Sequence, residues 1–373
     1  MKKSIISLAV LAAASNVAMA QSSVTIYGQI DAGFVSEHGG KNGAVNKVSS
    51  GVGGNSRIGF KGVEDLGNGL QTVFVLESGF NEDTGTQDTS GSLFNRQAYV
   101  GLASATAGTV TLGRQYTPLY TTIVNVADPF GGNYAGTAKN LLPTAGSNTR
   151  TSNTLMYTSP TAYGFSGEAA YAAGEQAGDN TAGRQWGAAA TYKNGPLVAK
   201  LAYNSRNNDV QPGQIDPVTG LTSTTGQARG NSKNTILAVN YDFQIVKAYA
   251  SYGVNKGFNS SAYNGSTTVA GTAYSNTQQI ASQDTRDELL GLSAPVGLNG
   301  TVMASVIHKE DRIGGNDANQ YGVGYSYALS KRTSAYIAYA HINNHGTAAY
   351  TVGNNNEVGT GDSAYNIGLH HAF

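Results

Sequence analysis

Hydrophobic and polar residues alternate along most of this chain with a period of two. In the first such segment five apolar side chains share one parity: Val24, Ile26, Ile30, Ala32 and Phe34. The same alternation recurs at 197–204, 237–243, 321–329 and 364–373. A period of two is that of a β-strand with one apolar face, and no comparable stretch keeps the 3.6-residue period of a helix. The pattern therefore predicts an all-β protein.

The connections between these segments are short and long in turn. Seven short ones contain residues suited to tight hairpins: 65–69, 104–108, 159–164, 194–195, 244–245, 295–300 and 330–332. Eight long polar ones lie between them: 36–55, 80–95, 116–152, 173–184, 205–233, 254–285, 309–319 and 342–363. Fifteen connections imply sixteen antiparallel strands, with tight turns at one rim and long loops at the other. This asymmetry is typical of a transmembrane β-barrel.

The N-terminal segment differs from the rest of the chain. Lys2 and Lys3 precede an apolar run from Ile5 to Ala14, and Ala18-Met19-Ala20 supplies small residues around a cleavage site. This order predicts a secretory signal peptide at 1–20 and a single barrel domain at 21–373. The apolar run is shorter than a helix needs to span a bilayer. An exported chain built of alternating strands points to the bacterial outer membrane.

Composition and charge narrow the function further. The chain has 49 Gly and 22 Tyr but no Cys, so it offers neither a disulfide framework nor a thiolate metal site. Basic and acidic residues number 23 each, which gives no reason to expect nucleic acid as a partner. We find no nucleophile elbow, phosphate-binding loop or His-Glu-x-x-His motif, so the sequence predicts no enzymatic activity and implies no cofactor. His370 and His371 are adjacent, so on a strand they face opposite sides and do not chelate a metal together.

Charged residues on the expected strands indicate what fills the barrel. Ile58 and Phe60 suit the outer face, which places Arg57 and Lys61 in the lumen. Arg96 opens another strand with parity opposite to that of Tyr99. A charge facing lipid near the bilayer midplane costs roughly 2–4 kcal/mol, so we expect these side chains to face water or one another. Sixteen strands enclose an aqueous channel rather than a packed core.

The connection from Tyr116 to Arg150 is longer than compact domains usually leave without regular structure. It contains the turn-rich sequence DPFGGN at 128–133, which could fold the loop back on itself. Asp128 is the acidic residue of this loop, against Lys139 and Arg150. We expect the loop to fold inward and narrow the channel.

Several motifs carry a resemblance that extends over most of the chain from residue 22 onward. They are SSVTIYGQIDAGF, SRIGFKGVEDLGNGL, RQAYVGLAS, GTVTLGRQY, DPFGG and the C-terminal YNIGLHHAF. With these motifs the chain resembles the general porins of Gram-negative bacteria, most closely the β-proteobacterial type. The resemblance implies a sixteen-stranded barrel that assembles as a homotrimer, with the third long loop folded into the lumen as a constriction.

The resemblance also implies roles for individual residues. Arg57, Arg96 and Arg150 correspond to the basic cluster that faces acidic groups of the third loop. Lys61, which its parity places in the lumen, would stand beside them at the constriction. Asp128 would be the acidic partner, although the chain reads DPFGG where enterobacterial porins read PEFGG, so the acid is displaced by one position. Because one acid stands against several basic groups, we predict a weak preference for anions. Arg114 resembles a residue that ties loops together near the trimer contact.

These expectations define a function and its partners. The chain should form a water-filled channel for passive diffusion of ions and small hydrophilic solutes. Partners would be a second and third copy of itself, outer-membrane lipid and lipopolysaccharide, and the barrel-assembly machinery. The expected assembly signal is the outer face of the last strand: Tyr365, Ile367, Leu369 and Phe373. Alternatives are a substrate-specific channel for sugars or a dicarboxylate, an outer-membrane enzyme, and a surface receptor or adhesin that binds through the loops at 205–233 and 254–285.

Overall fold

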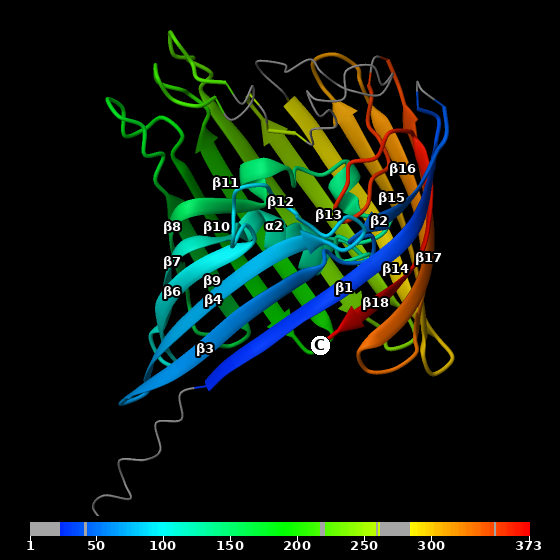
Figure 1. Ribbon diagram of the computed structural model, residues 1–373, viewed down its shortest axis with the longest axis horizontal. Coiled ribbons are helices and arrows are strands. Elements are labelled where there is room, and N and C mark those ends of the chain that lie inside the picture. The colour runs from blue at the N-terminus through cyan, green and yellow to red at the C-terminus, as the bar shows by residue number, and fades with distance from the viewer. Residues whose placement is uncertain (1–22, 41–42, 217–220, 259, 262–283, 347) are drawn as a thin grey trace, which may run out of the picture.

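The computed structural model describes residues 23–40, 43–216, 221–258, 260–261, 284–346 and 348–373. The expected signal peptide therefore lies outside the described residues. The described chain forms one closed antiparallel sheet around a lumen, with short turns at one rim and long loops at the other (Figure 1). The barrel is sealed by pairing of the first strand with the last.

Sixteen strands form the wall, as the alternation predicted. In chain order they are β1 (Ser23–His38), β3 (Arg57–Gly67), β4 (Leu70–Asn81), β6 (Gln97–Ser104), β7 (Gly108–Tyr116), β8 (Arg150–Thr158), β9 (Phe165–Ala172), β10 (Gln185–Asn194), β11 (Leu197–Asn207), β12 (Asn231–Asp242), β13 (Lys247–Lys256), β14 (Asp284–Val296), β15 (Gly300–Asp311), β16 (Ala318–Ala328), β17 (Thr333–Asn344) and β18 (Ser363–Ala372). Two further strands, β2 (Val45–Ser50) and β5 (Thr86–Gln87), lie within long connections and pair with β1 and β4.

The two faces of the wall differ as the pattern requires. Apolar side chains such as Ile26 and Leu290 are exposed on the outside, where a lipid phase would cover them. Polar side chains such as Asp31 and Gln320 are buried inside the barrel. Soluble proteins bury apolar side chains and expose polar ones. The opposite arrangement seen here is typical of a transmembrane barrel with a water-filled lumen.

The seven short connections coincide with the predicted turns. Asn68 and Gly69 join β3 to β4 with positive φ at both positions, the geometry of a type I′ hairpin. This backbone twist matches the twist of the paired strands, which explains why Asn-Gly recurs here. The long connections all leave the opposite rim (Figure 1).

The first long connection differs from the expected open loop at 36–55. β2 continues the ladder along β1, where Ser36 pairs with Asn46 and Ala32 with Ser50. β3 then takes over the pairing from Gln29 downward. The second strand of the wall is therefore interrupted, and the segment between its two pieces, residues 51–56, leaves the sheet. Alternation did not reveal β2 because VNKVSS carries polar residues on both faces.

The residue that follows the last strand, Phe373, extends the pairing that closes the barrel. Phe373 exchanges two backbone hydrogen bonds with Gly28 of β1, with N–O distances of 3.0 and 3.3 Å. Tyr365, Ile367 and Leu369 point outward along β18, each more than half exposed in the single chain. This places the predicted apolar face of the last strand on the outer surface, beside the seam.

The third long connection, residues 117–149, is called loop L3 below. It folds into the barrel as expected and contains α2 (Pro118–Thr122), η2 (Ile123–Ala127), η3 (Ala138–Asn140) and η4 (Gly146–Asn148) (Figure 1). None of the helices in the described part of the chain is long and apolar enough to cross a membrane.

Candidate functional site: the constricted lumen

Loop L3 is held against the inner wall by an apolar contact. Thr117 caps α2 by accepting a hydrogen bond from the Tyr120 amide, and Pro118 follows at the first helical position, where no N–H is needed. The loop then contributes apolar side chains that are almost fully buried: Leu119, Ile123, Leu141 and Leu142. They pack on inward-facing residues of the wall, including Ala202, Ile236, Ile307 and Ile342. The lumen thus contains a small hydrophobic core on one side, which leaves the water path on the other.

Asp128 does not occupy the position that the resemblance implied. Its carboxylate is turned into loop L3, where it accepts hydrogen bonds from the amides of Phe130, Gly132 and Ala138 at 2.9–3.0 Å and from the Thr137 hydroxyl at 3.4 Å. The side chain is 3% exposed, and burial raises its pKa to about 6 although these hydrogen bonds oppose the rise. Asp128 therefore shapes the tip of the loop and presents no carboxylate to the channel.

The basic cluster lies on the wall opposite loop L3. Arg57 on β3 and Arg96 before β6 lie on either side of one acidic residue, Glu77 of β4, with N–O distances of 3.3 and 2.8 Å. Arg150 at the start of β8 joins them through Tyr116, whose hydroxyl accepts hydrogen bonds from both Arg96 and Arg150. The structure thus brings together the three arginines that the sequence singled out.

Glu77 is the residue that sequence reasoning missed. Besides its two ion pairs it accepts a hydrogen bond from the Tyr27 hydroxyl at 3.0 Å, and it is 4% exposed. The signal was present, because Glu77 is the acidic residue of the strand LQTVFVLESGFN and a charge on that strand must avoid lipid. The resemblance implied a counter-charge on the loop, whereas the wall provides it.

Lys61 and Arg114 lie apart from this cluster. Lys61 is exposed in the lumen four residues along β3 from Arg57, a rise of about 13 Å. Its Nζ stands 5.3 Å from the centre of the Tyr27 ring, which places it nearer the short-turn rim. Arg114 lies at a bulge in β7, between Gly113 and Gln115, and donates to the Asn95 carbonyl at 2.6 Å and to Ser152 Oγ at 3.0 Å. It joins the end of the second long connection to β8.

Between the wall cluster and loop L3 lies the narrow part of the lumen. Arg57, Arg96, Tyr116 and His370 line it from the wall, while loop L3 contributes Asn125, Asn133 and Tyr134. The described residues that line this cavity include no Asp or Glu. One face is therefore basic and the other is neutral and polar.

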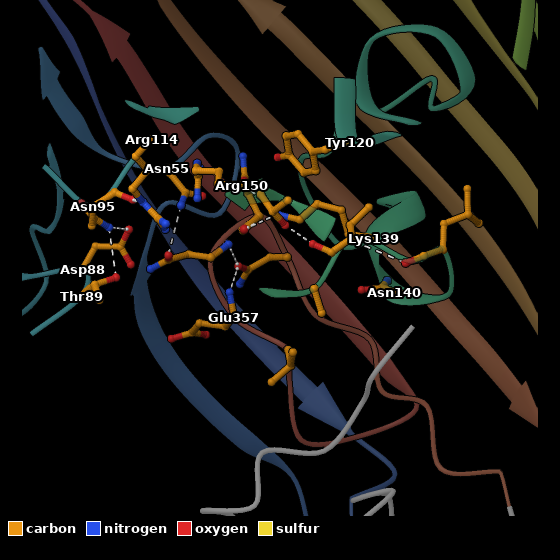
Figure 2. A pocket seen from close by; sticks show the side chains of 18 residues that line it. Asn55, Asp88, Thr89, Asn95, Arg114, Tyr120, Lys139, Asn140, Arg150 and Glu357 are labelled. Atoms are coloured by element: carbon orange, nitrogen blue, oxygen red, sulfur yellow. Dashed lines mark hydrogen bonds between the residues drawn. The ribbon is translucent and has the colours of Figure 1, made fainter. Parts of the chain in front are cut away.

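A second loop enters the lumen from the last long connection, residues 345–362, called loop L8 below. Asn355 lines the narrow cavity and accepts hydrogen bonds from Lys139 Nζ of loop L3 through both its backbone carbonyl and its side chain. Burial lowers the pKa of Lys139 to about 7, and the positive charges of Arg150 and Arg96 contribute further. Figure 2 shows Lys139 and Arg150 lining one pocket, called the upper pocket below.

No set of three or more acidic, histidine or cysteine side chains suited to a metal ion occurs among the residues that the structure describes. The site instead combines fixed charges, amides and aromatic rings around an open path. Such an arrangement filters solutes by size and charge.

Comparison with known proteins agrees with this architecture. A family model described as Gram-negative porin matches residues 7–347. The chain belongs to the Gram-negative porin family. It is 32% identical over 377 residues to an outer membrane porin protein of Bordetella pertussis, covering 90% of this chain and 93% of that protein. It is 31% identical to outer membrane porin protein 32 of Delftia acidovorans, over the full length of both.

Solved structures show the same fold. An anion-selective porin from Comamonas acidovorans superposes with a TM-score of 0.72 at 24% identity, covering 95% of this chain and all of that one. OmpF of Salmonella typhi, solved with daunomycin, superposes with a TM-score of 0.64 at 16% identity, covering 94% and 97%. This porin is accordingly a channel protein of the bacterial outer membrane, through which small hydrophilic solutes diffuse passively.

Proposed function

We propose that this porin is weakly anion-selective and that Arg57, Arg96 and Arg150 form its selectivity filter. The observation that carries the proposal is the composition of the narrow cavity: Arg57 and Arg96 face neutral groups of loop L3, and none of the described residues that line it is acidic. Arg150 does not line this cavity itself but is joined to it through the Tyr116 hydroxyl. Glu77 offsets one of the three positive charges of the cluster, which leaves the cluster beside the cavity with a positive excess. A fixed positive excess in a confined path raises the local concentration of anions over cations.

Two further observations bear on the sign and on the strength of this preference. The solved Comamonas porin that shares this fold is itself described as anion-selective. Outside the constriction, however, carboxylates such as Asp88 and Glu357 line the upper pocket and reduce the positive potential on the way in (Figure 2). Lys61 adds one more positive charge below the constriction.

The test is the reversal potential across a planar bilayer in a salt gradient. We expect the wild type to favour chloride over potassium, and the variant Arg57→Gln/Arg96→Gln to lose this preference. Arg332→Gln is the matched control, because Arg332 is exposed in the short turn between β16 and β17. Unchanged selectivity in the double variant, with its barrel intact by heat-modifiable migration, would remove the arginines from the filter.

We further propose that the protein assembles as a homotrimer with Arg114 near the contact. Support comes from the fold, since one solved neighbour, OmpT of Vibrio cholerae, is described in a trimer form, and from the position of Arg114 between Asn95 and Ser152. Arg114→Ala should lower the temperature at which the trimer dissociates in detergent while leaving the barrel of each protomer folded. A monomeric wild type in mild detergent would contradict the proposal.

The other proposed partners, which are lipid, lipopolysaccharide and the barrel-assembly machinery, follow from the apolar outer face of the barrel. The apolar outer face would contact lipid and, in the outer leaflet, lipopolysaccharide. The exposed side chains of β18 would be presented to the barrel-assembly machinery before the seam closes.

A further inference from the structure

The narrow cavity has a third side, which is formed by backbone rather than by side chains. Residues 51–56 leave the sheet between β2 and β3, and Gly53 and Gly54 of this segment line the same cavity as Arg57 and Asn133. The segment is called the inward bend below. Its residues 51–54 are buried, so it lies packed in the lumen and not at the rim.

Asp31 of β1 holds the inward bend at its centre and at both ends. Its Oδ1 accepts a hydrogen bond from the Gly53 amide at 2.7 Å, and its backbone carbonyl accepts one from the Gly51 amide at 2.6 Å. Its own amide donates to Ser56 Oγ at 2.9 Å. The side chain of Asp31 is fully buried, so these contacts are shielded from the water of the channel.

Side chains and glycines of neighbouring segments surround the Asp31 carboxylate closely. Tyr336 of β17 donates its hydroxyl to Oδ1 at 2.8 Å, and His370 Nδ1 lies 3.3 Å from Oδ2. The Tyr336 hydroxyl lies close above Gly33 and Gly368, where a Cβ would come within 2.9 Å of it or less. Gly53 has no room for a side chain either, because a Cβ there would lie 2.7 Å from Asp31 Oδ2.

The inward bend also carries loop L3. The Tyr134 amide donates to the Val52 carbonyl at 2.9 Å, and the rings of Tyr134 and Tyr336 are 4.8 Å apart. Val52 is fully buried between these rings and the wall. A continuous path of contacts therefore runs from Asp31 through the inward bend to the tip of loop L3, next to Asn133.

We propose that Asp31 is the positioning residue that sets the width of this channel, by fixing the inward bend and through it loop L3. Asp31 is buried and touches no solute, so it acts through Gly53, Val52 and Tyr134. The proposal rests on the water-filled lumen and is independent of the anion preference proposed above. In this proposal the inward bend limits the size of the solutes that pass, and the arginines select among solutes by their charge.

The experiment compares Asp31→Ala with Asp31→Asn in planar bilayers, using neutral polyethylene glycols of increasing size to find the largest that enters. Asn retains an oxygen for the Gly53 amide and the Tyr336 hydroxyl, so we expect the wild-type size limit and quiet open-channel current. Ala removes the acceptor, which releases the inward bend, so larger polymers should enter and the open-channel current should become noisier. Reversal potential recorded on the same channels separates this proposal from the anion filter.

Gly53→Ala provides a second route to the same state, because the added Cβ would push the inward bend off an intact Asp31. It should shift the size limit away from that of the wild type and add the same noise even if Asp31→Ala fails to assemble. Tyr336→Phe is the matched control, since it removes one hydrogen bond to Oδ1 but keeps the Gly53 contact and the ring. A folded Asp31→Ala or Gly53→Ala channel with the wild-type size limit and noise would overturn the proposal.

Discussion

Glu77 and Arg96 form a buried ion pair in the wall of the barrel, with Oε1 and Nε 2.8 Å apart and each side chain 5% exposed. The same carboxylate reaches Arg57 at 3.3 Å. One carboxylate paired with two guanidinium groups leaves these three side chains with a net positive charge. Because this charge is fixed by hydrogen bonds on the wall, it stays in place whichever solute passes.

Replacing Glu77 by Gln should strengthen the anion preference. The substitution removes the negative charge beside Arg57 and Arg96 and weakens charge-assisted hydrogen bonds that contribute roughly 1.5–3 kcal/mol each. We expect the reversal potential in a salt gradient to move further toward that of chloride. Glu64→Gln, at an exposed position near the end of β3, is the control. A shift toward potassium would mean that Glu77 does not compensate the arginines.

Lys139 should make selectivity depend on pH near neutrality. Its pKa is lowered to about 7 by burial and by Arg150 and Arg96, so its positive charge is present at pH 6 and largely lost at pH 8. Anion preference should therefore fall as the pH rises between these values, and Lys139→Met should remove this component. Lys331→Met, in an exposed turn, should retain it.

The same shift has a consequence for stability. Between about pH 7 and the ordinary lysine pKa near 10.4, the unfolded chain binds a proton at Lys139 that the folded chain does not. Stability therefore rises with pH across this window, because the cost of burying the charged form disappears. Thermal unfolding of wild type and Lys139→Met at pH 7 and pH 9 measures this contribution, and parallel changes in both proteins would argue against it.

Truncating the apolar contact of loop L3 should loosen the constriction without opening the wall. Leu119 is 1% exposed between the loop and the inner wall, and Leu→Ala at such sites costs about 2–5 kcal/mol. Leu119→Ala should raise open-channel noise and lower the temperature at which the loop becomes accessible to protease from the long-loop side. Leu298→Ala, in a fully exposed turn, should change neither.

Removing the last aromatic ring should reduce assembly rather than conductance. Phe373 is on the outer face at the seam with Gly28, where the ring fills the space that a side chain on Gly28 would occupy. Phe373→Ala should lower the amount of heat-modifiable barrel in the outer membrane several-fold, while the channels that do form conduct as the wild type does. Normal amounts of folded Phe373→Ala would refute a role in assembly.

The strands, the turns and the sorting of loop lengths could be predicted because each depends on neighbouring residues. Alternation shows which face of a strand meets lipid, and Asn68-Gly69 specifies its own hairpin. The three arginines could be found for the same reason, since a charge in a wall strand has to avoid the membrane. For these features the local pattern and the global fold require the same arrangement.

The partners of the arginines could not be predicted, because they depend on contacts between distant segments. Asp128 was expected to face the channel, yet four donors within its own loop turn it inward. Glu77 took that role from a strand that pairs beside Arg57. The inward bend could not be predicted either, because its local signal is the glycine content of GVGG, and this equally suits an open loop.

Both ends of loop L3 leave the same rim, at Tyr116 and Arg150. The hydrophobic core inside the lumen can therefore dock after β1 and β18 have met, with no chain end passing through the ring. Loop L3 can enter the lumen from the long-loop rim of a barrel that is already closed. Closure of the wall and docking of loop L3 are for that reason separable steps. A barrel whose loop has not yet docked would already carry the arginines of the wall but would lack the apolar contact that narrows its lumen.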